Sequence, residues 1–154
     1  MVTLKWCKDQ NRGISLIQPN DNLCAEYLAS AEETLTLLKD IEKKSRMWLA
    51  TTKYYCEYFA VYALLMKIGI KSEIHDCTIA LCELLESNHV IPKGTSRTLE
   101  RDKNLRIDNQ YYLKNREVPF DYDEMVEFII HMRQSIQSLT YDKIHSMREL
   151  VKRS

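Results

Sequence analysis

Residues 45–69 read SRMWLATTKYYCEYFAVYALLMKIG, and this stretch decides the fold. Large apolar and aromatic residues recur on most of its sides, namely Trp48, Tyr54, Tyr55, Tyr58, Phe59, Tyr62, Leu65 and Met66, with Ala60, Val61 and Leu64 between them. A helix that is apolar on most sides usually lies at the centre of a protein, and a glycine commonly ends it. The stretch therefore predicts a central helix over 45–68, stopped by Gly69. Its tyrosines suit core and interface packing, or alternatively a stacking platform for single-stranded nucleic acid.

The chain before this stretch predicts one more long helix. Asp21 or Asn22 can cap its start, and Lys43 and Lys44 suit the negative end of the helix dipole. Between them an apolar stripe recurs in steps of three or four residues: Leu28, Ala31, Leu35, Leu38 and Ile41. Residues 1–20 show no sustained period and are interpreted as an arm.

The chain after the stretch predicts three further helices and a tail helix. Ser72 can cap a helix over 73–87, and Thr95 or Ser96 can cap one that ends near Tyr112. Asp121 and Glu124 resemble a capping box and open a helix that runs to 139. Residues 140–154 then form a C-terminal tail helix that packs on this bundle or on a partner.

Composition supports a helical fold. The 154 residues include only three glycines and three prolines, and sheet proteins need more of both in their turns. We predict an all-α fold in one domain over 1–154, an antiparallel up-and-down bundle of four to five helices over 22–139 plus the C-terminal helix. No run of 18 apolar residues or secretion signal occurs, so we expect a cytoplasmic protein without a membrane partner.

The five cysteines suggest reduced, mostly buried thiols. Their number is odd and no Cys-x-x-Cys spacing occurs among Cys7, Cys24, Cys56, Cys77 and Cys82. A metal site of His75, Cys77 and Cys82 is disfavoured, because residues 77 and 82 lie about 140° apart on a helix. We expect no metal and no cofactor.

Charge is balanced overall, with 22 Lys and Arg against 22 Asp and Glu, but it is segregated locally. Residues 93–116 hold seven Lys and Arg against three Asp and Glu, a net charge of +4. Residues 117–127 hold five acidic residues and no basic one. The two segments form either a mutually neutralising surface or, on the basic side, a phosphate-binding strip.

Three segments together resemble the HEPN family of small helical domains. They are YLASAEETLTLLKDIEKK (27–44), KYYCEYFAVYALLMKIGIKSEIHDCTIALCEL (53–84) and NLRIDNQYY (104–112). The middle segment carries a Tyr-Tyr pair, Lys-x-Gly-Ile-Lys and Ser-x-x-His, and the likeness covers about 22–139. It implies a homodimeric bundle, often encoded beside a minimal nucleotidyltransferase in a prokaryotic toxin–antitoxin-like pair. Many relatives are metal-independent ribonucleases, and some nucleotidyltransferases attach AMP to a tyrosine of their helical partner.

The family's ribonuclease signature is Arg, four to six residues, then His, and this chain departs from it. Arg106 stands at the arginine, but the positions for histidine hold Tyr111, Tyr112 and Leu113. The resemblance therefore implies a binding module for nucleotide or RNA. The alternative is a ribonuclease that uses Arg106, with Tyr111 or His131 as a substitute base. The candidate catalytic residues are Arg106 and Tyr111, and the candidate binding residues are Arg101, Lys103, Arg106, Asn109, Gln110 and Tyr111.

Two simpler interpretations stay open at this point. Arg106 can be tied to Asp102 and Asp108 on its own helix, which would leave it a structural residue. His75, at the start of its helix, can be a packing or capping residue.

Overall fold

The computed structural model describes residues 2–154, and they fold into seven helices and one small antiparallel sheet of two strands. The helices are α1 (Leu4–Asp9), α2 (Asp21–Ile41), α3 (Arg46–Ile68), α4 (His75–Ser87), α5 (Thr95–Gln110), α6 (Tyr122–Ser138) and α7 (Tyr141–Arg153). The strands are β1 (Ile14–Leu16) and β2 (Ile70–Ser72). The fold is thus mostly helical, as the composition predicts, but the all-α prediction is wrong in missing the sheet.

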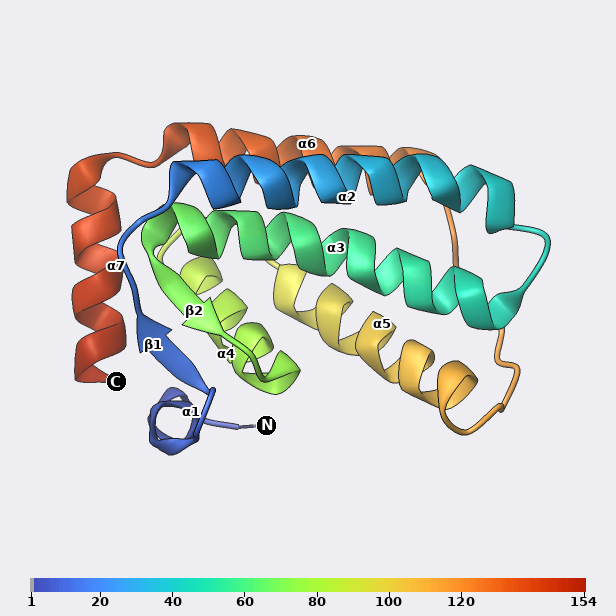
Figure 1. The fold of residues 1–154 in the computed structure, drawn as a ribbon, viewed down its shortest axis with the longest axis horizontal. Coiled ribbons are helices and arrows are strands. Elements are labelled where there is room, and N and C mark those ends of the chain that lie inside the picture. The colour runs from blue at the N-terminus through green and yellow to red at the C-terminus, as the bar shows by residue number, and fades with distance from the viewer. Residues whose placement is uncertain (1) are drawn as a thin grey trace.

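Helix α3 lies at the centre, as its apolar circumference predicts. Figure 1 shows α2 and α6 side by side along one side of α3, α5 along the other, and α7 standing across the end. Ser45 caps the start of α3, where its side chain accepts a hydrogen bond from Trp48 N. Gly69 ends α3 with a φ of 86°, a backbone conformation that glycine adopts at little cost.

The N-terminal residues interpreted as an arm contain α1 and β1. Strand β1 pairs antiparallel with β2, in the register Ile14↔Ser72, Ser15↔Lys71 and Leu16↔Ile70. Ser72 therefore belongs to a strand instead of capping a helix, and α4 begins at His75. Strands of three residues show no alternation that a sequence pattern could reveal, which is why both were missed.

The tail helix packs on its own protein. Met147 and Val151 of α7 are buried in the same core as α3 and α6. Arg148 secures the contact, because its Nη1 donates to the carbonyls of Ile17 at 2.7 Å and Gly69 at 2.8 Å. Of the two placements predicted for this helix, the structure therefore shows the one on the bundle.

Helix ends differ from the predicted ones by a few residues. Asn20 caps α2 in place of Asp21 or Asn22, and α5 ends at Gln110 instead of Tyr112. Asp121 caps α6 as predicted, accepting hydrogen bonds from the amides of Asp123 and Glu124. Within the described residues, none of the helices combines the length and the apolar character that crossing a membrane requires.

The prediction that all five thiols are reduced is wrong. Cys7 of α1 and Cys77 of α4 form a disulfide across 70 residues, and Cys24, Cys56 and Cys82 are free and buried. The pairing depends on α1, an element that the sequence pattern did not predict. No group of three or more His, Cys, Asp or Glu side chains within 2–154 could hold a metal ion.

Candidate functional site

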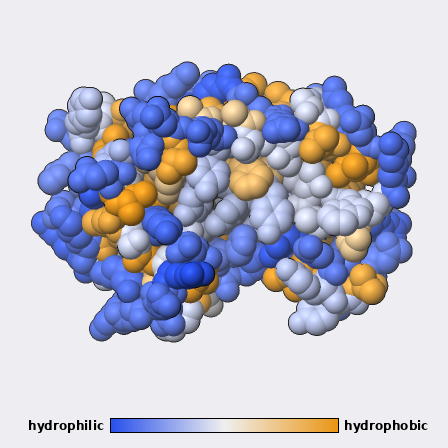
Figure 2. All heavy atoms as spheres, in the orientation of Figure 1, coloured by the Kyte–Doolittle hydropathy of each residue, from blue (hydrophilic) through white to orange (hydrophobic). Residues whose placement is uncertain are grey.

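A stripe of aromatic side chains runs along α3. Tyr54, Tyr58 and Tyr62 follow at four-residue steps, and Tyr55 and Phe59 form a parallel row, so the rings lie on one side of the helix. Tyr54 is fully buried, whereas Tyr55, Tyr58 and Phe59 are partly exposed. Figure 2 shows pale side chains of intermediate hydropathy gathered in the middle of this face, over α3. The stripe is therefore both core and surface, which leaves the packing and the stacking interpretations compatible.

His75 joins this stripe from the first turn of α4. Its Nδ1 lies 2.6 Å from the Tyr54 hydroxyl, and its ring centroid lies 4.7 Å from that of Tyr58. Burial and the neighbouring Tyr58 raise the pKa of Tyr54, so that hydroxyl keeps its proton. It is buried and has no other hydrogen-bond partner in the described residues, so it donates to Nδ1. The neutral imidazole of His75 then carries its own proton on Nε2.

The surroundings of His75 favour its neutral form. Burial lowers its pKa, the positive charges of Arg106 and Lys103 lower it further, and Asp76 acts in the opposite direction. Arg106 and His75 meet at the Tyr54 ring, whose centroid lies 4.9 Å from Arg106 Cζ and 5.5 Å from the centroid of the imidazole. The sequence interpretation of His75 as a packing residue agrees with its contacts with the tyrosines, but the sequence did not predict that it lies near Arg106.

Arg106 reaches the same rings from α5. Its Nη1 donates to the Tyr55 hydroxyl at 3.0 Å, and its Cζ lies 4.9 Å from the ring centroid of Tyr54 and 5.9 Å from that of Tyr111. The residue is only 6% exposed, and its Nε is buried without a hydrogen-bond partner. We call the group of Tyr54, Tyr55, Tyr58, His75 and Arg106 the aromatic–arginine site.

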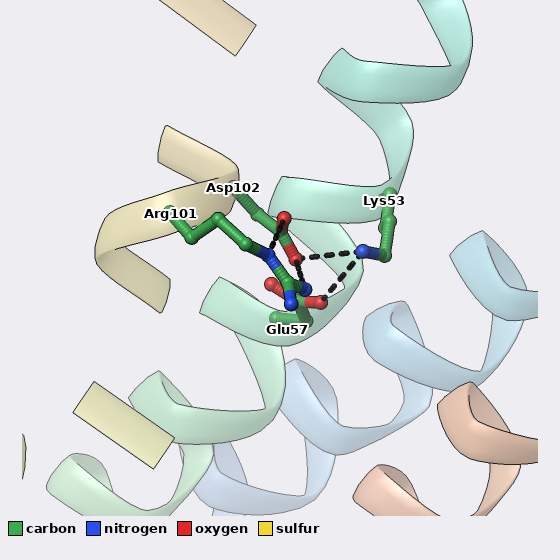
Figure 3. A network of polar contacts seen from close by, with 4 residues as sticks. All are labelled: Lys53, Glu57, Arg101 and Asp102. Carbon is green, nitrogen blue, oxygen red and sulfur yellow. Dashed lines mark hydrogen bonds and ion pairs between the residues drawn. The ribbon is translucent and has the colours of Figure 1, made fainter. Parts of the chain in front are cut away.

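The guanidinium of Arg106 has no carboxylate partner among residues 2–154. Asp102, one turn earlier on α5, bonds instead to Lys53 at 2.8 Å and to Arg101 at 2.8 Å (Figure 3). The interpretation that ties Arg106 to Asp102 is therefore wrong. Aromatic faces compensate a buried positive charge only in part, whereas an anion would complement it.

The network around Asp102 includes a fourth charged residue, Glu57 of α3. Its Oε1 lies 4.0 Å from Lys53 Nζ, and its Oε2 is buried without a partner (Figure 3). Burial and the charge of Asp102 raise the pKa of Glu57 well above its usual value. Burial would also raise the pKa of Asp102, but hydrogen bonds from Arg101, Glu57 and Lys53 hold that pKa below its usual value. A buried polar seam thus runs between α3 and α5.

The basic strip 93–116 does not form a continuous row of free cations. Four of its seven basic side chains form ion pairs: Arg101 with Asp102, Lys103 with Asp76, and both Lys114 and Arg116 with Asp108. These pairs also show that Asp108 does not hold Arg106. Among the described residues, Lys93 before α5, Arg97 in its first turn and Arg106 near its end form no ion pair.

The other predicted binding residues divide into two groups. Asn109 is 2% exposed and holds the following loop, because its Oδ1 accepts from Arg116 N at 2.7 Å and its Nδ2 donates to Arg116 O at 3.0 Å. Gln110 has a buried Oε1 without a partner, and Tyr111 is 64% exposed beside Arg106. The structure therefore gathers Arg106 and Tyr111 at the site, whereas Asn109 is committed to the loop.

His131 does not replace the missing signature histidine. It lines a hollow with Thr95 and Thr98 at the start of α5. Eight residues separate Thr98 from Arg106, which corresponds to about 12 Å along a helix.

Sequence reasoning did not connect His75 with Arg106. Both lie in segments that carry the HEPN likeness, but only the packing of α4 against α5 shows that they converge. In the sequence, the one indication that His75 lies near the tyrosines is that Tyr54 and His75 both belong to the HEPN-like segment 53–84. Comparison with protein families, with curated proteins and with solved structures found no match to this chain, so the likeness stays a prediction.

Proposed function

We propose that this protein is a helical binding module for a nucleotide, with Arg106 as the phosphate-binding residue. The observation that carries the proposal is Arg106, which is only 6% exposed, lacks a carboxylate partner in the described chain and leaves Nε unpaired. A guanidinium donates two parallel hydrogen bonds to a phosphate, and these charge-assisted bonds are among the stronger ones in proteins.

The rings around Arg106 supply the second half of a nucleotide site. Tyr55 is partly exposed and Tyr111 is 64% exposed, so both offer faces on which a base can stack. Because Arg106 itself is only 6% exposed, a phosphate reaches it after a rim side chain moves. Tyr111 suits that movement, since it stands at the end of α5 with most of its surface in solvent.

The ligand is a mononucleotide or the end of a strand. A long strand needs a row of free cations along its backbone, and most cations of the strip 93–116 are paired with aspartates. Binding should therefore depend on salt about as expected for one or two phosphate contacts.

The HEPN likeness supports a homodimer that acts with a nucleotidyltransferase partner in a prokaryotic two-gene system. The described surface supports a protein partner independently. Four large apolar or aromatic side chains are more than half exposed around the start of α3 and the end of α5: Trp48, Tyr111, Tyr112 and Leu113. Exposed apolar side chains that cluster usually mark an interface.

A metal-independent ribonuclease is the second candidate, favoured by the position of His75 near Arg106. A general base needs a free lone pair within reach of the substrate hydroxyl. In His75 the Nδ1 lone pair accepts the hydrogen bond of Tyr54, so the imidazole is not available as a base in this arrangement. The geometry favours binding over cleavage.

Titration of the protein with 5′-AMP by isothermal calorimetry tests the proposal. Arg106→Met should weaken binding by about 10- to 100-fold, the usual effect of losing hydrogen bonds to a charged group. Arg97→Met is the matched control, because it removes an arginine of the same helix that is exposed and outside the site. Equal affinity in Arg106→Met and the natural chain would refute the role of Arg106.

Incubation with labelled RNA in the absence of metal separates the two candidates. The natural chain should leave the RNA intact, and Tyr111→His tests whether a histidine at the signature spacing creates cleavage. Robust cleavage by the natural chain that disappears in His75→Gln and Arg106→Met would establish the ribonuclease instead.

A further inference from the structure

The N-terminal segment holds the start of α4 on both sides of His75. We call residues 3–17, which include α1 and β1, the N-terminal strap. On one side of His75 the Glu73 amide donates to the carbonyls of Arg12 at 3.1 Å and Gly13 at 3.3 Å. On the other side Cys77 is bonded to Cys7. The strap is therefore bonded to the chain at Glu73, two residues before His75, and at Cys77, two residues after it.

The strap also connects to the tyrosine stripe through β2. Its strand β1 pairs with β2, and the amide of Ser72 in β2 donates to the Tyr62 hydroxyl at 3.3 Å. Thr78 donates to the Ser72 hydroxyl at 3.0 Å and so closes the turn between β2 and α4. These contacts fix the turn that carries His75 towards Tyr54.

The disulfide is the covalent attachment of the strap to α4. Helix α1 has only six residues, too few for a helix to be stable without tertiary contacts, and it packs on α4 and β1. The side chains of Cys7 and Cys77 are fully buried, so a reductant reaches the bond when α1 frays. Opening the bond leaves α1 attached by noncovalent contacts alone.

We propose that the Cys7–Cys77 disulfide is a redox-controlled latch that positions His75 in the aromatic–arginine site and so controls nucleotide binding. The inference rests on the proposed function. In the closed state His75 holds the Tyr54 hydroxyl, and the Tyr54 ring lies under the Arg106 guanidinium. In the open state the start of α4 loosens, the contact between His75 and Tyr54 weakens, and the ring under Arg106 loses its support.

The chemical step is thiol–disulfide exchange with a dithiol reductant. One thiolate of the dithiol attacks a sulfur of the Cys7–Cys77 bond, and its second thiol resolves the mixed disulfide. The protein disulfide gains two electrons and two protons and becomes two thiols, while the dithiol is oxidised to a disulfide. The buried Cys24, Cys56 and Cys82 are already free, so a reductant changes only this pair.

Two readouts on the full chain, before and after dithiothreitol, test the latch. NMR titration of the His75 imidazole reports its position, and calorimetry with 5′-AMP reports the site. Reduction should move the pKa of His75 from its lowered value towards about 6.5, because the imidazole gains water. It should also weaken 5′-AMP binding about fivefold or more, the lower end of ordinary coupling between sites.

Two variants serve as controls. Cys7→Ser should resemble the reduced protein and should not respond to dithiothreitol. Cys82→Ser removes a buried free thiol from the same helix α4, so it should respond as the natural chain does.

The outcomes separate the latch from the proposed function. An unchanged His75 pKa, when alkylation shows two new thiols, overturns the latch, and so does finding Cys7 and Cys77 alkylated before reduction. Global loss of helical circular dichroism on reduction overturns it too, because the bond would then be a staple of the whole fold. A His75 pKa that shifts while no state binds 5′-AMP supports the positioning role of the bond and refutes the nucleotide site and its control.

Discussion

Replacing Asp102 with asparagine tests whether the buried ion network joins α3 to α5. Asp102 is 2% exposed and bonds to Lys53 at 2.8 Å, and the Lys53 side chain is 6% exposed. Asparagine keeps the size of the side chain but removes its charge. Lys53 then stays buried with only the Glu57 carboxyl, 4.0 Å away, near it. Removing one partner of a buried pair costs about 3–5 kcal/mol, because the other charge is left uncompensated in a dry interior.

Asp108→Asn on the same helix is the matched control. Asp108 also pairs with two basic side chains, Lys114 and Arg116, but these partners are 46% and 55% exposed. Water already solvates such pairs, so their loss costs less than about 1 kcal/mol. The two substitutions make the same chemical change, but Asp102 is buried and pairs with α3, whereas Asp108 pairs with exposed residues that follow it in the chain.

Urea unfolding at pH 7, followed by circular dichroism, measures both free energies of unfolding. A lower midpoint with an unchanged slope would assign the loss to the folded state. The double substitution Lys53→Met with Asp102→Leu should recover part of the loss, because it removes the buried charge of Lys53 together with that of Asp102. Glu57 then loses its nearby cation, but its raised pKa favours a neutral carboxyl, and Arg101 is half-exposed to water. If Asp102→Asn costs no more than Asp108→Asn, the network does not stabilise the contact and the reasoning is wrong.

Three further predictions concern pH, the tail helix and assembly. Because the pKa of Glu57 is raised in the folded chain, the free energy of unfolding should fall as pH rises above about 4.3, the pKa of an unfolded glutamate. Glu57→Gln should remove that fall in urea unfolding at pH 5, 6.5 and 8. A free energy of unfolding that rises more with pH in the natural chain than in the variant would contradict this prediction. Arg148→Met should lower the free energy of unfolding by about 2–3 kcal/mol, because the carbonyls of Ile17 and Gly69 lose their charged donor, and a thermal melt unchanged from the natural chain would argue against it. Sedimentation at micromolar concentration should give a dimer, and a single species at 18.2 kDa would exclude it.

The long helices could be predicted because their signals are local. The run from Ser45 to Gly69 carries its cap, its apolar surface and its stop within one stretch, and α3 follows these signals to within a residue. Asp121 starts α6 in the same way. The sheet depends on pairing residues 14–16 with 70–72, and neither strand is long enough to show a period. The missed elements are therefore those whose stability comes from distant partners.

In the candidate site, too, the contacts that could not be predicted are those between distant parts of the chain. Arg106 could be singled out only through the HEPN likeness of NLRIDNQYY, and its contact with the aromatic rings of α3 was not predicted. The pairing of Lys103 with Asp76 could not be predicted, because the aspartate comes from α4. Likewise Cys7 meets Cys77 only after α1 has folded onto α4. A charge count along a segment identifies cations, but the tertiary structure decides which of them stay available.

The buried side of α5 is mostly polar. Its buried positions include Leu99, Asp102, Arg106 and Asn109, in steps of three and four, and only the first is apolar. The buried side-chain atoms without a partner in the described residues are Glu57 Oε2, Arg106 Nε and Gln110 Oε1, and all three belong to α3 or α5. Each such atom costs about 1–3 kcal/mol, and native proteins hold few of them. Apolar side chains would join the two helices more stably, so stability alone does not account for this seam. Under the proposed function, a nucleotide would supply partners to Arg106 Nε and Gln110 Oε1, the two of these atoms that belong to α5.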